Sequence, residues 1–136
     1  MEKLFGQIAI TSASGIFIFL FGAWDIAFQV LCVFMVLDYL TGVMSAFVNR
    51  KLSSKQGING IFKKLAILCT IIVAVMLDRV LDTDMLRLAT IFCLIGNEGI
   101  SLLENLTTLG APIPGQIVDS LSQLRGKDDN DTRSQK

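Results

Sequence analysis

Few side chains in this sequence could do chemistry, and Asp38 is the most unusual of them. It is the only charged residue in the apolar run 26–48. An ionised carboxylate in apolar surroundings is costly, so it must be protonated, face water or pair with a cation. Lys63 or Lys64 would approach it if the helix that carries them started deeper in the membrane than its apolar run indicates. Asp38 therefore either holds helices together through hydrogen bonds or serves a polar lumen or gate.

A second polar group follows later in the chain, at Asn97, Glu98, Ser101, Glu104 and Asn105. In a helix, residues 97, 101, 104 and 105 share one face, with Glu98 close to it. This stripe either lines a polar interior or marks a helix that emerges into water. The two carboxylates have no nucleophile, metal-ligand set or phosphate-binding loop near them, so they do not indicate a hydrolase.

The composition excludes several classes of function. The chain has no histidine, and its three cysteines lie inside apolar runs without the spacing of a redox or metal motif. The net charge is zero, which gives no reason to expect a nucleic-acid partner. We therefore expect no catalytic residue, metal or cofactor. A small membrane enzyme such as a lipid kinase would also need a glycine-rich phosphate loop, which is absent from the sequence.

Long apolar runs must position these polar groups. Hydrophobic residues make up 52% of the 136 residues, and the runs 4–24 and 26–48 are each long enough to cross a bilayer as a helix. Two shorter spans are predicted at 62–81 and 85–103. The fold class is therefore an all-α integral membrane protein with four transmembrane helices, or three if the first or fourth segment only lies in the interface. The stretch before Asp25 matches a signal-peptide cleavage site poorly, so the first span is expected to remain uncleaved.

The segment 49–64 predicts the orientation in the membrane. It carries five basic residues and no acidic one: Arg50, Lys51, Lys55, Lys63 and Lys64. Short basic loops stay on the cytoplasmic side, so this segment is expected to be a cytoplasmic loop. By alternation of the spans, the N- and C-termini are then cytoplasmic as well.

The character of the chain changes after residue 103. Segment 104–125 is expected to form a juxtamembrane linker rich in proline and glycine, followed by a short amphipathic helix. That helix would lie on the inner membrane face or pack on a neighbouring subunit. The charged tail 126–136 is expected to be disordered. Within the second span, Gly42 and Ala46 are spaced to let another helix approach closely.

Several blocks of this sequence are similar to one known family. Over roughly residues 26–125, the chain resembles the toxin-secretion/phage-lysis holin family, a group of bacteriophage holins. The blocks that carry the resemblance occur in the family's order: DYLTGV at 38–43, NRKLSS at 49–54, GINGI at 57–61, KK at 63–64, LD at 77–78, NEGISLLEN at 97–105 and GAPIP at 110–114.

The resemblance implies a function. Holins of this family come from phages and prophages, largely of Gram-positive bacteria, and some accompany clostridial toxin genes. They accumulate in the cytoplasmic membrane, self-associate and open lesions through which an endolysin or a toxin passes, and they have no catalytic residues. The implied partners are a second copy of the chain, the lipid bilayer, and an endolysin or toxin. Two alternatives stay open: a regulated ion channel or small transporter subunit with Asp38 as an ion or proton site, and an antiholin.

Overall fold

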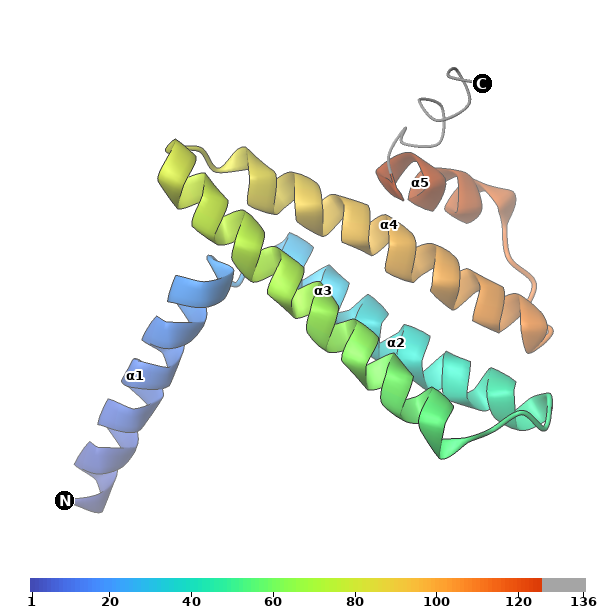
Figure 1. Ribbon diagram of the computed structural model, residues 1–136, viewed down its shortest axis with the longest axis horizontal. Coiled ribbons are helices and arrows are strands. Elements are labelled where there is room, and N and C mark those ends of the chain that lie inside the picture. Colours follow the sequence, from blue (N-terminus) through green and yellow to red (C-terminus); the bar gives the residue numbers. More distant parts are fainter. Residues whose placement is uncertain (126–136) are drawn as a thin grey trace.

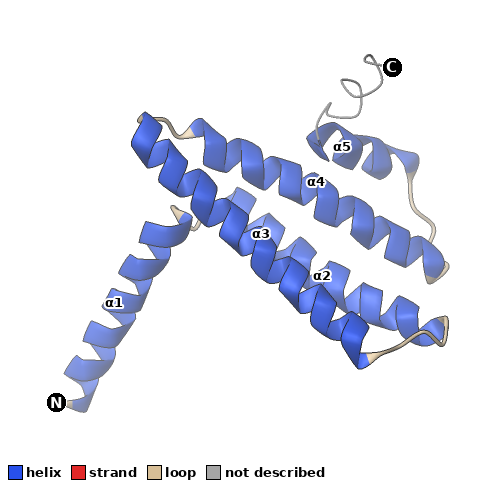
Figure 2. Ribbon diagram, viewed as in Figure 1, coloured by secondary structure: helices blue, strands red, loops and turns tan. Residues whose placement is uncertain are grey.

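The structure is a computed structural model that describes residues 1–125, apart from the side chains of Phe5 and Ala9. Over this range it consists of helices and connecting turns, without strands (Figure 2). The helices are α1 (Glu2–Phe21), α2 (Ile26–Val48), α3 (Ser54–Leu81), α4 (Met85–Thr108) and α5 (Gly115–Arg125). The first four are long and apolar enough to cross a membrane. The predicted all-α membrane protein with four spans is thus confirmed, and the tail 126–136 lies outside the described residues.

Helices α2, α3 and α4 form a bundle, and the other two helices are arranged around it (Figure 1). Helix α4 contacts both α2 and α3 extensively, and α5 packs back along α4. Helix α1 points away from the bundle, so that the N-terminus lies far from the other helices. The bundle has two ends, which we call the basic end, at the α2–α3 turn with Arg50 and Lys51, and the Arg87 end, at the α1–α2 and α3–α4 turns.

Local capping explains where two of the helices begin. The Asp25 carboxylate accepts a hydrogen bond from the Phe28 backbone N–H at 2.9 Å and so caps α2. The Ser53 hydroxyl accepts from the Gln56 N–H at 3.2 Å and caps α3. Helix α1 ends at Phe21, before the predicted residue 24, because Gly22 has φ 76° and leaves the helical region.

The early start of α3 corrects the predicted basic loop. The sequence predicted this span from residue 62, whereas the helix begins at Ser54. Lys55, Lys63 and Lys64 are therefore helical, and only Arg50 and Lys51 lie in the turn. The physical reason is the Ser53 cap, which lets the helix extend well before its apolar part. Helix α4 likewise runs past the predicted residue 103 to Thr108, which shortens the linker before α5.

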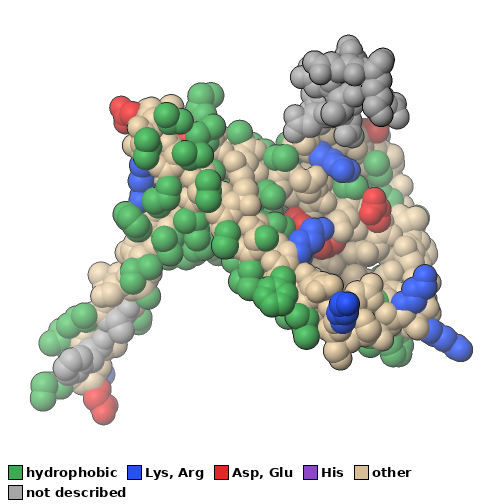
Figure 3. All heavy atoms as spheres, viewed as in Figure 1, with side chains coloured by type: hydrophobic (Ala, Val, Ile, Leu, Met, Phe, Trp, Pro, Cys, Tyr) green, Lys and Arg blue, Asp and Glu red, His purple; other side chains and the backbone are tan. Residues whose placement is uncertain are grey.

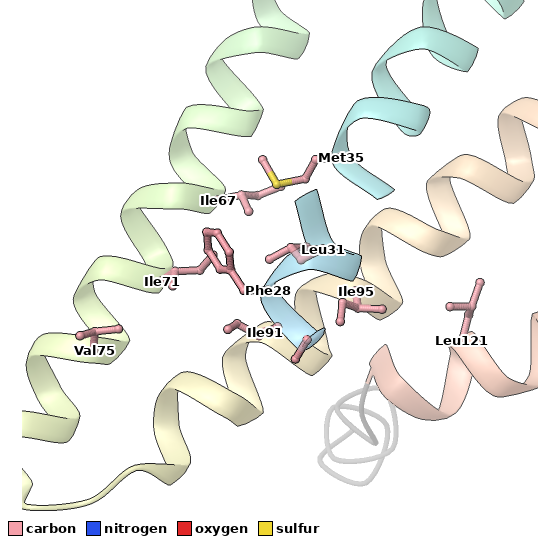
Figure 4. Packing of buried hydrophobic residues seen from close by; sticks show 10 residues of the cluster. Phe28, Leu31, Met35, Ile67, Ile71, Val75, Ile91, Ile95 and Leu121 are labelled. Atoms are coloured by element: carbon pink, nitrogen blue, oxygen red, sulfur yellow. The ribbon is translucent and has the colours of Figure 1, made fainter. Parts of the chain in front are cut away.

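An apolar core fills the bundle between its middle and the Arg87 end. Leu31 of α2, Ile71 of α3 and Ile91 of α4 are completely buried, and Phe28 is 2% exposed. Figure 4 shows these side chains pointing toward one another from the three helices. In lipid, exposed apolar side chains meet no water, so this core stabilises the bundle through close van der Waals packing rather than through the hydrophobic effect.

Helix α1 is attached to the bundle only near its C-terminal end. Phe17 and Phe21 pack on Phe28 of α2, with ring centroids 5.7 and 5.6 Å from it, and Trp24 lies 5.5 Å from the same ring. The apolar window by which α1 qualifies as a membrane span is not buried against the rest of the chain. The greater part of α1 is therefore open to lipid or to another protein.

Helix α5 packs on α4 of its own chain, which differs from both predicted locations for it. Leu121 is buried, and a Cβ atom at Gly99 would come within 2.7 Å of its side chain. At Gly96 a Cβ atom would meet the backbone of Arg125, only 2.7 Å from its Cα atom. Two glycines on α4 thus allow α5 to approach closely, a contact that the apolar stripe of α5 alone did not indicate.

Candidate functional site

A buried group of three charged side chains joins the three helices of the bundle. The Lys64 ammonium on α3 donates to the carboxylates of Asp38 on α2 and Glu98 on α4. We call these residues the Lys64 triad. Glu98 is 1% exposed and Asp38 is 8% exposed. Asp38 therefore pairs with a cation, one of the three possibilities raised above.

Further polar groups support Asp38. The Asn105 side-chain amide donates to the Asp38 carboxylate, to the Asp38 backbone carbonyl and to the Thr41 hydroxyl, each at 3.2 Å. The Thr41 hydroxyl in turn donates to the Leu37 carbonyl at 2.8 Å. No buried side-chain nitrogen or oxygen lacks a hydrogen-bond partner among the described residues. The charges are therefore held in a hydrogen-bonded network, which is how ionised groups are tolerated in an apolar medium.

The charge balance of the triad decides which of its members matters most. With both carboxylates ionised, it holds two negative charges and one positive charge. Lys64 is the only cation that the structure places within ion-pair distance of Asp38 or Glu98 among residues 1–125. Removal of Lys64 would leave two uncompensated carboxylates side by side, whereas removal of either carboxylate would leave a neutral pair.

Two polar hollows adjoin the triad. One, of about 300 Å³, lies between α2, α3 and α4 toward the basic end and is lined by Asp38, Ser101 and Asn105 among others. The other, of about 310 Å³, lies between α3 and α4 next to Arg125 of α5, at the level of the triad, and Glu98 and Ser101 are among its lining residues. On the basic-end side of the triad, the first hollow thus takes the place of the apolar core found on the other side.

The predicted polar stripe on α4 is divided between two faces. Glu98 and Asn105 point into the bundle, where they join the Asp38 network. Asn97 and Glu104 are exposed, and Ser101 is half-buried between the two hollows. The single stripe was wrong because α4 packs through the face that carries residues 91, 95, 98, 102 and 105, so that residues 97 and 104 turn outward.

The small residues of α2 lie where close packing is needed within the chain. A Cβ atom at Gly42 would lie 3.5 Å from the Asn105 amide, so α4 approaches α2 closely at this point. Gly42 and Ala46 both line the first hollow. These residues therefore serve contacts and space inside one subunit.

A second polar cluster, which was not among the predicted site residues, lies at the Arg87 end. The Arg87 guanidinium donates to the carbonyls of Phe21 and Ala23 at 2.7 and 2.6 Å and pairs with the Asp25 carboxylate at 2.6 Å. The Asp78 carboxylate accepts the backbone N–H groups of Leu86 and Arg87 at 3.0 and 2.8 Å. We call Asp25, Asp78 and Arg87 the Arg87 cluster.

The Arg87 cluster joins three elements at one end of the bundle. Asp78 caps the N-terminus of α4 from α3, and Arg87 holds the α1–α2 turn against α4. The hydrogen bond from Arg87 holds the pKa of the Asp25 carboxyl below its usual value. The sequence held one signal for this cluster: Asp78 and Arg87, two residues of opposite charge, flank the short acidic link at residues 82–84.

Residues 1–125 offer no other obvious reactive centre. No group of histidine, cysteine, aspartate or glutamate side chains in this part of the chain could hold a metal ion. Cys32, Cys69 and Cys93 form no disulfide bond.

Comparisons with known proteins agree with this architecture. A sequence profile of the bacteriophage holin family matches residues 15–126. The "14.9 kDa protein in nagH 3′ region" of Clostridium perfringens is 47% identical over 131 residues, which cover 93% of this chain and 99% of that protein. The probable holin of Bacillus phage phi105 is 33% identical over 109 residues, 79% of each chain.

No solved structure matches the chain significantly. The family match covers the C-terminal third of α1 and all of the bundle, and the phage relative covers more than two thirds of both chains. The resemblance noted in the sequence is thereby confirmed. This multi-pass membrane protein belongs to the bacteriophage holin family.

Proposed function

We propose that this protein is a phage or prophage holin that oligomerises in the bacterial cytoplasmic membrane and permeabilises it. An endolysin, or a toxin, then leaves the cytoplasm through the lesions, and the host cell lyses. The observation that carries this proposal is family membership over residues 15–126, together with the relative named a probable holin. The role requires no catalytic residue, metal or cofactor.

The Lys64 triad supports accumulation of the protein before lesions open. An isolated Asp38 or Glu98 carboxylate would oppose insertion into lipid. Pairing with Lys64 inside each subunit removes much of this penalty, since the ammonium compensates one of the two negative charges and Asn105 satisfies further lone pairs. A single subunit can thus be stored in the membrane with its charged groups covered.

We also propose that the basic end faces the cytoplasm, with both termini on that side. Arg50 and Lys51 in the α2–α3 turn and Lys55 in the first turn of α3 support this orientation by the positive-inside rule. A cysteine introduced at Lys51 should react with an impermeant thiol reagent in inside-out vesicles but not in intact cells. Reaction from the outside of intact, unlysed cells would reverse the orientation.

The function is tested by inducible expression in bacteria that carry a potential-sensitive dye, with and without an endolysin. A holin should give sudden depolarisation at a reproducible time, and lysis only when the endolysin is present. Graded, ion-selective depolarisation would instead indicate a channel or transporter subunit. A chain that causes no depolarisation but delays lysis by a co-expressed holin would be an antiholin.

A further inference from the structure

Helix α5 places a polar surface beside the membrane-spanning part of α4. Leu121 packs on Gly99 and the backbone of Arg125 lies against Gly96, so α5 runs back along α4 as far as the level of the Lys64 triad. Most of its exposed side chains are polar: Gln116, Asp119, Ser120, Ser122, Gln123 and Arg125. Ile117, Val118 and Leu124 are exposed to a smaller extent, by 47%, 40% and 38%.

Neighbouring residues of α3 and α4 extend this polar surface. Lys63, Asn97 and Glu104 are exposed, and they line the hollow of about 310 Å³ together with Arg125. Figure 3 shows Lys, Arg, Asp and Glu side chains gathered around the hollowed region next to α5. We call the surface formed by α5 and these residues the α4–α5 face.

At the same level, the side of the bundle formed by α2 and α3 is mainly apolar, although Lys55 and Asn59 are also exposed there. Between the triad and the basic end, α2 and α3 expose large hydrophobic side chains: Met44 55%, Phe47 71%, Ile58 52%, Ile61 50% and Phe62 64%. Side chains of this kind suit contact with hydrocarbon. The membrane must therefore extend past the triad toward the basic end on this side, which places α5 at membrane depth on the other.

Polar groups at that depth need water or protein as a neighbour, because lipid chains offer no hydrogen-bond partner. We propose that in the assembled holin the α4–α5 face of each subunit borders the water of the lesion, while the exposed α2–α3 face borders lipid. The inference rests on the proposed function, since it names the surface that would line the proposed lesion. In this arrangement the water-facing surface is the outer α4–α5 face, and the Lys64 triad stays intact inside the subunit.

The test uses single cysteines in an otherwise full-length chain whose native Cys32, Cys69 and Cys93 are replaced by alanine. The purified protein is placed in liposomes that contain fluorescent dextran, and efflux is measured before and after addition of a maleimide that carries a polyethylene glycol chain. Three sites are compared: Ser122→Cys on α5, Phe47→Cys on α2, and Lys51→Cys in the basic turn as a water-exposed control outside the bilayer.

We expect the Ser122→Cys chain to react and its dextran efflux to fall several-fold, because the polymer then occupies the lesion. The Lys51→Cys chain should react without a change in efflux, and the Phe47→Cys chain should remain unmodified. Each variant is compared with its own efflux before the reagent, so that a folding defect is not mistaken for obstruction. Gln123→Cys provides a second α5 site if Ser122→Cys alone disturbs the lesion.

The outcomes separate this inference from the proposed function. If the unmodified chain releases no dextran and no small dye at all, the holin proposal fails. If efflux occurs but modification at both Ser122→Cys and Gln123→Cys leaves it unchanged, the α4–α5 face does not line the lesion, although the protein remains a holin. Modification and obstruction at Phe47→Cys would reverse the assignment of the two faces.

Discussion

The Lys64 triad and the Arg87 cluster are both built from charged residues of three segments, but they stabilise different things. In the triad, every ionic contact joins side chains of separate helices in the middle of the bundle. In the Arg87 cluster, most contacts go to backbone groups of turns and a helix end. Water can replace the latter contacts at the membrane surface, whereas nothing in hydrocarbon can replace the former. The triad should therefore control association of the helices, and the cluster the shape of one end.

The largest effect should come from Lys64→Met. This change leaves Asp38 and Glu98 buried without a counter-charge, and we expect a loss of about 3–5 kcal/mol of unfolding free energy. The measurement is reversible unfolding in detergent micelles. Lys63→Met is the matched control, because the neighbouring Lys63 is exposed. Equal stability of the two variants would show that the triad does not hold the bundle together.

The triad can be probed further by removing all of its charges. Adding Asp38→Leu and Glu98→Leu to Lys64→Met should recover most of the lost stability, since apolar residues of similar volume often replace a buried ionic group without loss. Membrane permeabilisation by this triple variant then tells whether the charges serve more than stability. A triple variant less stable than Lys64→Met alone would contradict the charge-balance argument.

Next in size is Arg87→Met, which removes the ion pair to Asp25 and two hydrogen bonds to the α1–α2 turn. We expect a loss of about 2 kcal/mol. Amide hydrogen exchange should accelerate at residues 21–25 and stay slow in the middle of α2. Lys55→Met, at an exposed cation on the other end, is the control. Uniform acceleration along α2 would mean that the cluster also controls helix association.

A smaller effect is expected for Glu98→Gln. Lys64 keeps Asp38 as its ionic partner, and the glutamine oxygen can still accept a hydrogen bond, so the loss should be about 1–2 kcal/mol. Glu104→Gln, on the exposed side of α4, should leave the unfolding free energy within about 0.5 kcal/mol. The same measurement in micelles applies. A loss for Glu98→Gln as large as for Lys64→Met would argue against the assigned charges.

The smallest effect should be the pH dependence of the Arg87 cluster. The folded pKa of Asp25 lies below its ordinary value of 3.8, so its stabilising contribution is complete above that value and is lost as the pH falls through the lowered pKa. Trp24, the only tryptophan, adjoins Asp25 and should report the change by fluorescence. The transition should disappear in Asp25→Asn. Persistence of the transition there would assign it to another group.

The spans were predictable from the sequence because apolar runs long enough to cross a bilayer are typical of transmembrane helices. Asp38 was recognisable by its cost in such a run, and Lys64 was considered as a partner. The choice of Lys64 over Lys63 depended on which face of α3 turns toward α2 and α4, and only the packing of the helices decides that. The early start of α3 did have a signal in the sequence, since Ser53 followed by Gln56 three residues later is the pattern of a capping box.

The partners of α4 and α5 could not be predicted in the same way. Apolar residues occur on more than one face of α4, because apolar side chains suit contact with lipid as well as with a protein core. The pattern of apolar residues therefore does not tell which face of α4 turns inward. The division of Glu98 from Asn97 follows only from packing on α2 and α3. Likewise, Gly96 and Gly99 admit α5 closely, but glycines in a membrane helix have many possible uses.

Gly99 is the point at which α4 contacts both α2 and α5. A Cβ atom there would meet Leu121 of α5 on one side and, at 3.0 Å, the ring of Phe34 of α2 on the other. The same point on α4 thus touches two helices that are far apart in the chain. A displacement of α2 would therefore change the packing of Leu121, so that the positions of α2 and α5 depend on each other through Gly99.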